Sequence, residues 1–260
     1  MTTCINCSAE GEGRYCAHCG QRLEVKRLTW KEAWHDFWAR LYGFDGMFPR
    51  TFKDLTIRPG QASLEFIKGN RARYYGPVGY FFLMITCFLL LLSILGLNVV
   101  DYMTEMQRTV SDTETEAPLN KDIRVIVSDN LKLIAFIYIP LQAFTARFLF
   151  FRRQGLNFLE HSVLPLYVMG HWYWINMVEA LFLKFGGFTF GVTVHWIAMM
   201  LYMGFAYTSL IAGQPKWKSF LKGLGVFVSS YMILFVVALI VLVIAVLIDP
   251  SIREAIRPPK

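Results

Sequence analysis

The stretch PVGYFFLMITCFLLLLSILGLN at residues 77–98 contains no charged side chain. An α-helix rises 1.5 Å per residue, so about 20 apolar residues span a hydrocarbon layer of about 30 Å. Inside such a layer the backbone must satisfy its own hydrogen bonds, which favours a helix. The stretch therefore predicts a transmembrane helix and places the chain among membrane proteins.

Four more apolar segments follow this one along the chain. They cover about residues 131–151, 161–183, 190–212 and 223–248. Five segments of this length predict an all-α membrane protein with about five transmembrane helices, although one of the more polar middle segments could be re-entrant. Five buried helices of a soluble protein are the alternative, which the segment lengths disfavour. We expect three parts: residues 1–23, a cytoplasmic segment 24–76, and a transmembrane domain 77–260.

The composition supports this class. Of the 260 residues, 55% are hydrophobic and 17% are charged, against about a quarter charged in an average soluble domain. A chain with so much apolar surface is not intrinsically disordered. Five cysteines in 260 residues also exclude a disulfide-dense secreted scaffold.

The lysines and arginines predict the orientation, because cytoplasmic loops carry an excess of them. Residues 1–76 contain 12 of the 26 basic residues. Six more lie in connectors on the same side, namely Arg147, Arg152, Arg153, Lys216, Lys218 and Lys222. The amino terminus is therefore expected in the cytoplasm and the carboxyl terminus outside. The net charge of +7 is explained by this asymmetry, so membrane lipids are expected partners and nucleic acid is not.

Two Cys-x-x-Cys pairs, Cys4/Cys7 and Cys16/Cys19, are separated by eight residues. Two such pairs can direct four thiolates at one ion, which predicts a small structural zinc ribbon. Iron bound by four thiolates and a pair of disulfides are the alternatives, and a cytoplasmic location disfavours the disulfides. Four protein ligands leave no open position for catalysis. A cytoplasmic protein partner is a candidate ligand of this ribbon.

An amphipathic helix is expected after the ribbon. Thr29 and Glu32 have the spacing of a capping box, and a stripe of Trp30, Trp34 and Trp38 follows. Such a stripe beside membrane helices suits a helix lying among the lipid headgroups, or one that packs on the ribbon or a partner. Arg58-Pro59-Gly60 then breaks the chain before another short helix.

A family resemblance enters at this stretch. The pattern is Thr51-x-x-Asp54-Leu55-x-x-Arg58-Pro59-Gly60, then Gly69-x-Arg71-x-x-Tyr74-x-x-Pro77, preceded by the ending Cys19-Gly20-Gln21 of the ribbon. It resembles a bacterial family of membrane proteins of unknown function, whose members place a similar ribbon before the stretch and several helices after it. The resemblance implies a bacterial inner membrane and no activity.

Cations just before the first transmembrane helix can pair with lipid phosphates, and tyrosine anchors at the interface. Arg58, Arg71, Arg73 and Tyr74 are therefore candidate headgroup contacts. A more specific hypothesis joins Lys68 to the three arginines in a phosphate-binding site for a headgroup or a nucleotide.

Ionisable residues inside membrane segments form a candidate polar site. Its members are Arg147, His171, Glu179 and His195. A short turn between the third and fourth segments should bring Glu179 and His195 to similar depth, where they could pair. The set could line a solute path or make interhelical hydrogen bonds. A less favoured alternative is a metal site of an intramembrane hydrolase, formed by His161, His171, Glu179 and His195.

No serine-nucleophile elbow, phosphate loop or dinucleotide fingerprint occurs in the sequence. We therefore name no catalytic residue and no cofactor beyond structural zinc. The expected function is non-enzymatic: a membrane-anchored binding or scaffolding protein. The alternative is a transporter of a small solute, ion or lipid, which with five helices would work as a homo-oligomer.

Overall fold

The structure is a computed structural model that describes residues 2–4, 8–19, 23, 47–70, 73–108, 128–210 and 214–248. The chain divides into two compact units, Met1–Gly46 and Met47–Lys260. Several predictions fall outside the described residues: those for Cys7, the ending Gly20–Gln21, the helix expected from Thr29, Arg71 and the chain after residue 248.

The N-terminal unit contains a short antiparallel hairpin. Strand β1 (Thr2–Thr3) pairs with β2 (Glu10–Gly11), and Thr2 lies opposite Gly11. Two backbone hydrogen bonds adjoin the strands: Cys4 N donates to Ala9 O at 2.9 Å, and Ser8 N donates to Cys4 O at 2.8 Å. Ser8 has a φ of 58°, the left-handed conformation that a tight turn after a Cys-x-x-Cys pair requires.

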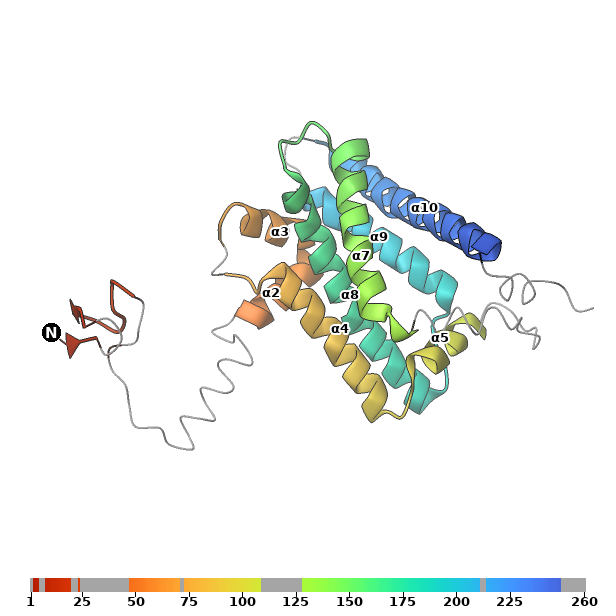
Figure 1. The fold of residues 1–260 in the computed structure, drawn as a ribbon, viewed down its shortest axis with the longest axis horizontal. Coiled ribbons are helices and arrows are strands. Elements are labelled where there is room, and N and C mark those ends of the chain that lie inside the picture. Colours follow the sequence, from red (N-terminus) through yellow and green to blue (C-terminus); the bar gives the residue numbers. More distant parts are fainter. Residues whose placement is uncertain are drawn as a thin grey trace, which may run out of the picture. The chain divides into compact units, whose positions relative to one another are not determined.

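The second unit is helical throughout its described part (Figure 1). Its elements are α2 (Met47–Ile57), α3 (Pro59–Ile67), α4 (Pro77–Ile94), α5 (Val99–Arg108), α7 (Leu131–Thr145), the π-helix η1 (Ala146–Phe150), α8 (Phe158–Gly186), α9 (Val192–Leu210) and α10 (Lys216–Ile248). Each of the five apolar segments overlaps for most of its length with one element, namely α4, α7 with η1, α8, α9 or α10.

Local sequence sets the helix ends. Pro59 is the first residue of α3 and Pro77 is the first residue of α4. Proline lacks a backbone N–H, and at the first position of a helix that group has no partner within the helix, so no hydrogen bond is lost. A capping box opens α8: Glu160 N donates to Asn157 Oδ1 at 2.8 Å, and Asn157 N donates to Glu160 Oε2 at 2.7 Å. Gly187 ends the same helix with a φ of 69°, which glycine adopts without strain.

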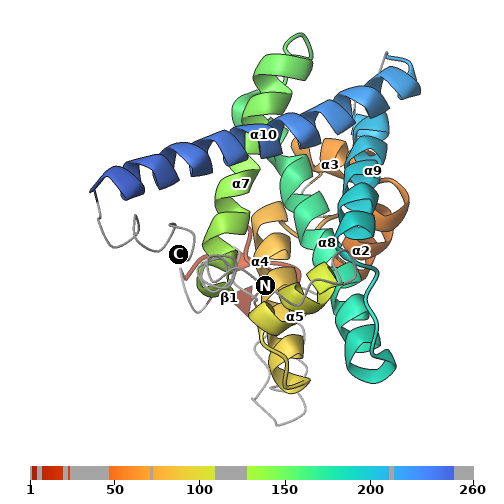
Figure 2. The same ribbon diagram turned by 90° about the vertical axis from the view of Figure 1, so that its right-hand side faces the viewer.

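Helix α8 is the central element of the helical unit. It packs along α4 and α7 and also contacts α3 and α9, and Figure 2 shows it between α4 and α9. Its side chains enter two hydrophobic clusters, with Tyr167 and Tyr173 in one and Val168 and Trp172 in the other. A helix buried on several sides needs apolar residues all round, which explains why α8 is not amphipathic.

Within the part of the chain that the structure describes, three helices are long and apolar enough to cross a membrane: α4, α7 together with η1, and α10 over Lys216–Ile240. The prediction of a helical chain of membrane type is confirmed at this level. Helices α8 and α9 are also long, at 29 and 19 residues, but histidines and other polar residues reduce their hydropathy. The C-terminal part of α10 extends beyond its neighbours (Figure 2), and its Phe235 is 63% exposed, as a lipid-facing residue would be.

Candidate functional site

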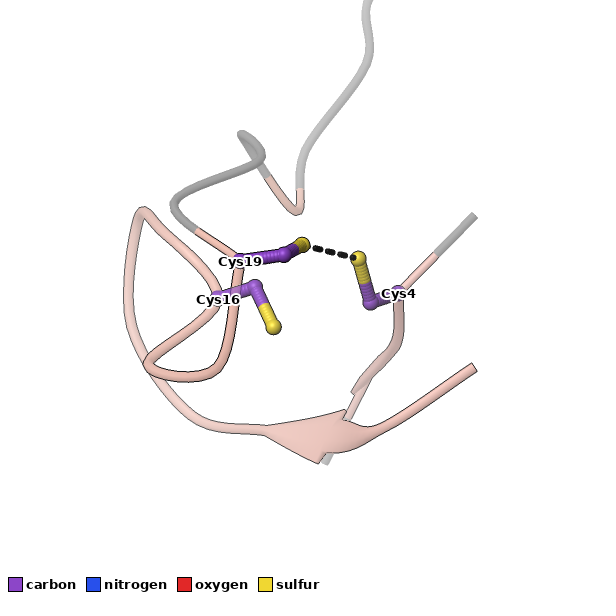
Figure 3. A group of neighbouring side chains, drawn as sticks. All are labelled: Cys4, Cys16 and Cys19. Carbon is purple, nitrogen blue, oxygen red and sulfur yellow. Dashed lines mark hydrogen bonds between the residues drawn. The ribbon is translucent and has the colours of Figure 1, made fainter. Parts of the chain in front are cut away.

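The N-terminal unit brings three of the four predicted metal ligands together. The Sγ atoms of Cys4, Cys16 and Cys19 all lie within 4.8 Å of one another, and those of Cys4 and Cys19 are 3.5 Å apart. The three sulfurs border one space (Figure 3). Cys4 and Cys16 are buried and Cys19 is exposed.

This arrangement fits a thiolate metal site. Zinc–sulfur bonds of about 2.3 Å in a tetrahedron place the sulfurs about 3.8 Å apart, which lies between the two distances just given. A disulfide would need about 2.05 Å, which is far shorter than the 3.5 Å between the Cys4 and Cys19 sulfurs. The three cysteines could therefore hold a metal ion, with Cys7 as the fourth ligand expected from the sequence.

In the helical unit, Asp54 is the centre of a charged network at the junction of α2 and α3. Arg58 donates to both carboxylate oxygens, from Nε at 3.1 Å and from Nη2 at 2.9 Å. The Tyr74 hydroxyl lies 2.9 Å from Asp54 Oδ2 and 2.8 Å from Glu65 Oε2. Arg73 adds ion pairs of 3.8 Å to Asp54 and 3.5 Å to Glu65. Two arginines thus neutralise two carboxylates around one buried phenol.

The network shifts the ionisation of its members. Burial alone would raise the pKa of Asp54, but hydrogen bonds from Arg58 and Tyr74 outweigh it and leave the pKa below its ordinary value. The Asp54 carboxylate raises the pKa of Arg58. Burial, reinforced by Glu65 and Asp54, raises the pKa of the Tyr74 hydroxyl. Asp54 is therefore held as a carboxylate and Tyr74 as a neutral phenol.

Other residues of the same sequence pattern fix α2 and α3 to the longer helices. Thr51 Oγ1 accepts a hydrogen bond from Tyr75 N at 2.9 Å, and Leu55 O accepts one from the Tyr202 hydroxyl of α9 at 2.9 Å. A Cβ atom on Gly60 would lie 2.1 Å from Ala206 O, so only glycine lets α3 approach α9 this closely. The residues of the pattern that carried the family resemblance therefore hold α2 and α3 against the longer helices.

These contacts bear on the predicted headgroup contacts. Tyr74 is 1% exposed, so the structure places it in the core and not at a lipid interface. Arg58 and Arg73 lie against carboxylates but remain about one-third exposed at their side chains, 33% and 39%. Lys68 is exposed at the end of α3. Lipid contact by the two arginines stays a prediction.

His171 of α8 is buried and joins three helices. Its Nδ1 lies 2.8 Å from the Tyr80 hydroxyl of α4, and its Nε2 lies 3.1 Å from Thr56 Oγ1 of α2. Thr56 Oγ1 donates its proton to Phe52 O at 2.9 Å, so it accepts from Nε2–H. Tyr80 then donates to Nδ1. A neutral His171 satisfies every bond, and both ring nitrogens are used within the protein.

The structure brings Glu179 of α8 and His195 of α9 together. His195 Nδ1 lies 3.4 Å from Glu179 Oε2, and Glu179 is 1% exposed. Trp172 Nε1 donates to His195 Nε2 at 2.6 Å, which leaves the ring proton on Nδ1, facing the carboxylate. Tyr102 OH and Phe190 N each donate to the same carboxylate at 3.0 Å. The buried acid therefore links α5, α8 and α9.

Arg147 does not join the other members of the predicted polar site. It lies in η1, where its Nη1 donates to Arg152 O at 3.0 Å on an exposed surface. His161, near the start of α8, is 1% exposed and stacks on Phe151 at 6.5 Å. The set predicted from the sequence thus separates into the Glu179–His195 pair, the His171 junction and Arg147.

Sequence reasoning missed several partners of these residues. Glu65 follows Arg58 by seven residues, two helical turns, which was an available signal. The sequence patterns singled out neither Tyr102 nor Trp172. Thr56 and Tyr80 gave no signal, because nothing in their local sequence indicates a partner on α8.

The region that resembles known proteins contains the helices α2 and α3. The family described as "Protein of unknown function (DUF3667)" matches residues 45–89, which include α2, α3 and the first part of α4. No curated protein and no solved structure matches the chain. Over residues 45–89 the chain is therefore similar to a family of unknown function. The match includes Asp54, Arg58, Glu65 and Tyr74 but neither the four N-terminal cysteines nor α8 and α9.

Proposed function

We propose that the chain is a non-enzymatic, membrane-anchored binding protein whose N-terminal cysteine unit engages a cytoplasmic protein partner. The observation that carries the proposal is the grouping of three thiols within 4.8 Å in a compact unit of its own. A closed site of four thiolates offers no open position for substrate, so the unit contributes a surface and not a reaction.

The metal of this unit is proposed to be structural zinc, held by Cys4, Cys7, Cys16 and Cys19. So short a segment has too little apolar surface to fold alone, and a bound metal supplies about 10–16 kcal/mol in comparable peptides. Together these residues form a zinc ribbon. Iron is the competing ion and would reveal itself by visible absorption from thiolate-to-iron charge transfer.

A capture experiment with the full chain tests this function. The tagged protein is purified from native membranes as wild type, as Cys16→Ser and as Cys87→Ser, and metal content and co-purifying proteins are measured. We expect one zinc per chain and a shared partner for wild type and Cys87→Ser, and loss of both for Cys16→Ser. A partner retained by a zinc-free Cys16→Ser protein would overturn the proposal.

The helical unit is proposed to cross a bacterial inner membrane five times, with the amino terminus in the cytoplasm and the carboxyl terminus outside. Three helices with sufficient length and apolar character support membrane insertion. The lengths of α8 and α9 allow them to cross as well. The surplus of basic residues before residue 77 supports the orientation.

A second candidate function, transport of a small solute, ion or lipid by a homo-oligomer, is favoured by the Glu179–His195 pair. A buried carboxylate between long helices is costly and is often retained for a function. If transport is the function, Glu179→Gln should abolish it in a protein that still folds, whereas cysteine variants should not. Cross-linking in membranes that yields only monomers would count against this candidate.

A further inference from the structure

An apolar cavity of about 320 Å³ lies between α5, α7, α8, α9 and α10. Met103, Ile134, Met169 and Met199 contribute to its wall, one from each of the first four helices. Its size is at the lower end of the roughly 300–1,000 Å³ of small-molecule sites in proteins. Methionine side chains are flexible and polarizable, so such a wall adapts to apolar ligands of varied shape.

One polar group of this wall has no partner. Asn176 lines the cavity, and its Oδ1 atom is buried without a hydrogen bond within the described part of the chain. A buried carbonyl oxygen without a donor costs about 1–3 kcal/mol. His195 and Trp172 also line the cavity, but they bond to each other, and the second nitrogen of His195 faces Glu179. Asn176 Oδ1 is therefore an acceptor that a ligand could satisfy.

The cavity reaches the surface beside an aromatic pair. Trp196 of α9 lines it and is 41% exposed, and its ring centroid lies 4.2 Å from that of Tyr231 of α10. Both side chains lie on helices that we propose to cross the membrane. A molecule dissolved in the lipid layer would reach the cavity beside this pair of rings.

We propose that this cavity binds a neutral lipid-like molecule: an apolar chain that fills the space and one O–H or N–H group that donates to Asn176 Oδ1. The charge of Glu179 is already met by Tyr102, Phe190 N and His195, so it offers nothing to a cation. An anion would place negative charge against the Asn176 carbonyl oxygen. The proposal goes beyond the cysteine unit and does not depend on it.

The test uses bromine as a quencher of tryptophan fluorescence, because Trp172 and Trp196 line the cavity. The full chain in lipid nanodiscs is titrated with 12-bromododecan-1-ol, with 1-bromododecane, which lacks the donor, and with 12-bromododecanoate, which is charged. We expect saturable quenching, with the alcohol bound about tenfold more tightly than the bromoalkane and the carboxylate.

Three variants locate the site. Asn176→Leu should remove the tenfold preference for the alcohol and leave bromoalkane binding unchanged. Ala135→Phe and Val192→Phe each place a ring in the cavity from a different helix, and either should abolish saturable quenching. Leu201→Phe, on the exposed side of α9, is the control and should behave as wild type. Thermal unfolding identifies any variant that fails to fold.

Equal affinity of the wild type for the alcohol and the bromoalkane would overturn the role of Asn176. Saturable quenching that persists in folded Ala135→Phe and Val192→Phe proteins would overturn the cavity as the site. Tighter binding of the carboxylate would overturn the neutral class of ligand.

Discussion

At the scale of single residues, Asp54 shows how a short motif acquires its role from contacts between distant parts of the chain. Arg58 reaches it from one turn away, whereas Tyr74 reaches it across twenty residues. The spacing in the sequence revealed the break at Arg58 and the helix start at Pro77. It did not reveal that Tyr74 is buried, because that depends on the docking of α2 and α3 against α8 and α9.

We expect Asp54→Asn to reduce the free energy of unfolding by roughly 2 kcal/mol at neutral pH, since a hydrogen-bonded charge is lost and two arginines lose a partner. The folded-state pKa of Asp54 lies below its ordinary value of 3.8. Its contribution is therefore present above that value and disappears as pH falls through the lower, folded-state pKa. Unfolding in detergent, followed across pH, should show the difference from wild type shrinking in that range.

Lys53→Gln provides the control, because Lys53 is an exposed charge of the same helix. It should change stability little at any pH. A difference between wild type and Asp54→Asn that stays constant down to the lowest pH would show that the carboxylate charge is not what stabilises the junction.

The Glu179–His195 pair yields a second prediction at this scale. In Glu179→Gln the new side-chain amide can adopt two orientations. One places its NH₂ group against His195 Nδ1–H, and the other places it against Phe190 N–H, so two donors face each other in either case. His195 cannot escape by moving its proton to Nε2, because Trp172 Nε1–H faces that atom. We expect a loss of about 1–3 kcal/mol in the free energy of unfolding.

Removing the tryptophan donor should relieve this conflict. In a Trp172→Phe background His195 can adopt the other tautomer, so Glu179→Gln should cost less there than in wild type, by at least about 0.5 kcal/mol. A double-mutant cycle by SDS titration measures the difference. Strict additivity of the two changes would contradict the proton positions inferred for His195.

At the scale of elements, apolar length located the long helices but not all of their ends. Helix α8 begins at Phe158 and not near residue 161, because Asn157 and Glu160 form a capping box that was readable in the sequence. Helix α10 begins at Lys216, seven residues before the apolar segment, since a helix continues through polar residues that remain solvated. Helix α5 was not predicted, because it lies between two of the apolar segments and is itself amphipathic.

The packing of α3 on α9 depends on Gly60. A Cβ there would lie 2.1 Å from Ala206 O and 2.4 Å from Leu210 N, both backbone atoms that cannot rotate away. Gly60→Ala should therefore separate the two helices and cost about 1–3 kcal/mol or more in the free energy of unfolding. Gly76→Ala is the matched control, because nothing lies within 4 Å of its Cβ and its φ is −58°. Equal stabilities of the two variants would contradict the close approach.

At the scale of the whole molecule, the division into two compact units predicts independent responses to metal removal. If the cysteine unit holds the proposed metal, a chelator should unfold it, because that metal would supply the folding free energy of so short a segment. The thermal unfolding midpoint of the helical unit should then shift by no more than about 2 °C, because unfolding one unit does not change the stability of another to which it is not energetically coupled. Scanning calorimetry of the full chain with and without chelator measures both transitions, and a large shift of the helical transition would show that the units are coupled.

The number of membrane crossings can be decided at the connection between α8 and α9. If five helices cross, Phe188 lies outside, whereas Gln154 and Gln214 lie in the cytoplasm. If only α4, α7 with η1, and α10 cross, all three positions lie in the cytoplasm, because α8 and α9 would then stay on one side. Each position is changed to cysteine in turn in a Cys87→Ser background, and intact spheroplasts are treated with a membrane-impermeant maleimide. The background protein, which keeps Cys4, Cys7, Cys16 and Cys19, gives the reference labelling. We expect labelling of Phe188→Cys alone.

No labelling at any of the three positions would favour three crossings. Labelling of Gln154→Cys would reverse the orientation, with the cysteine unit outside and its thiols exposed to oxidation.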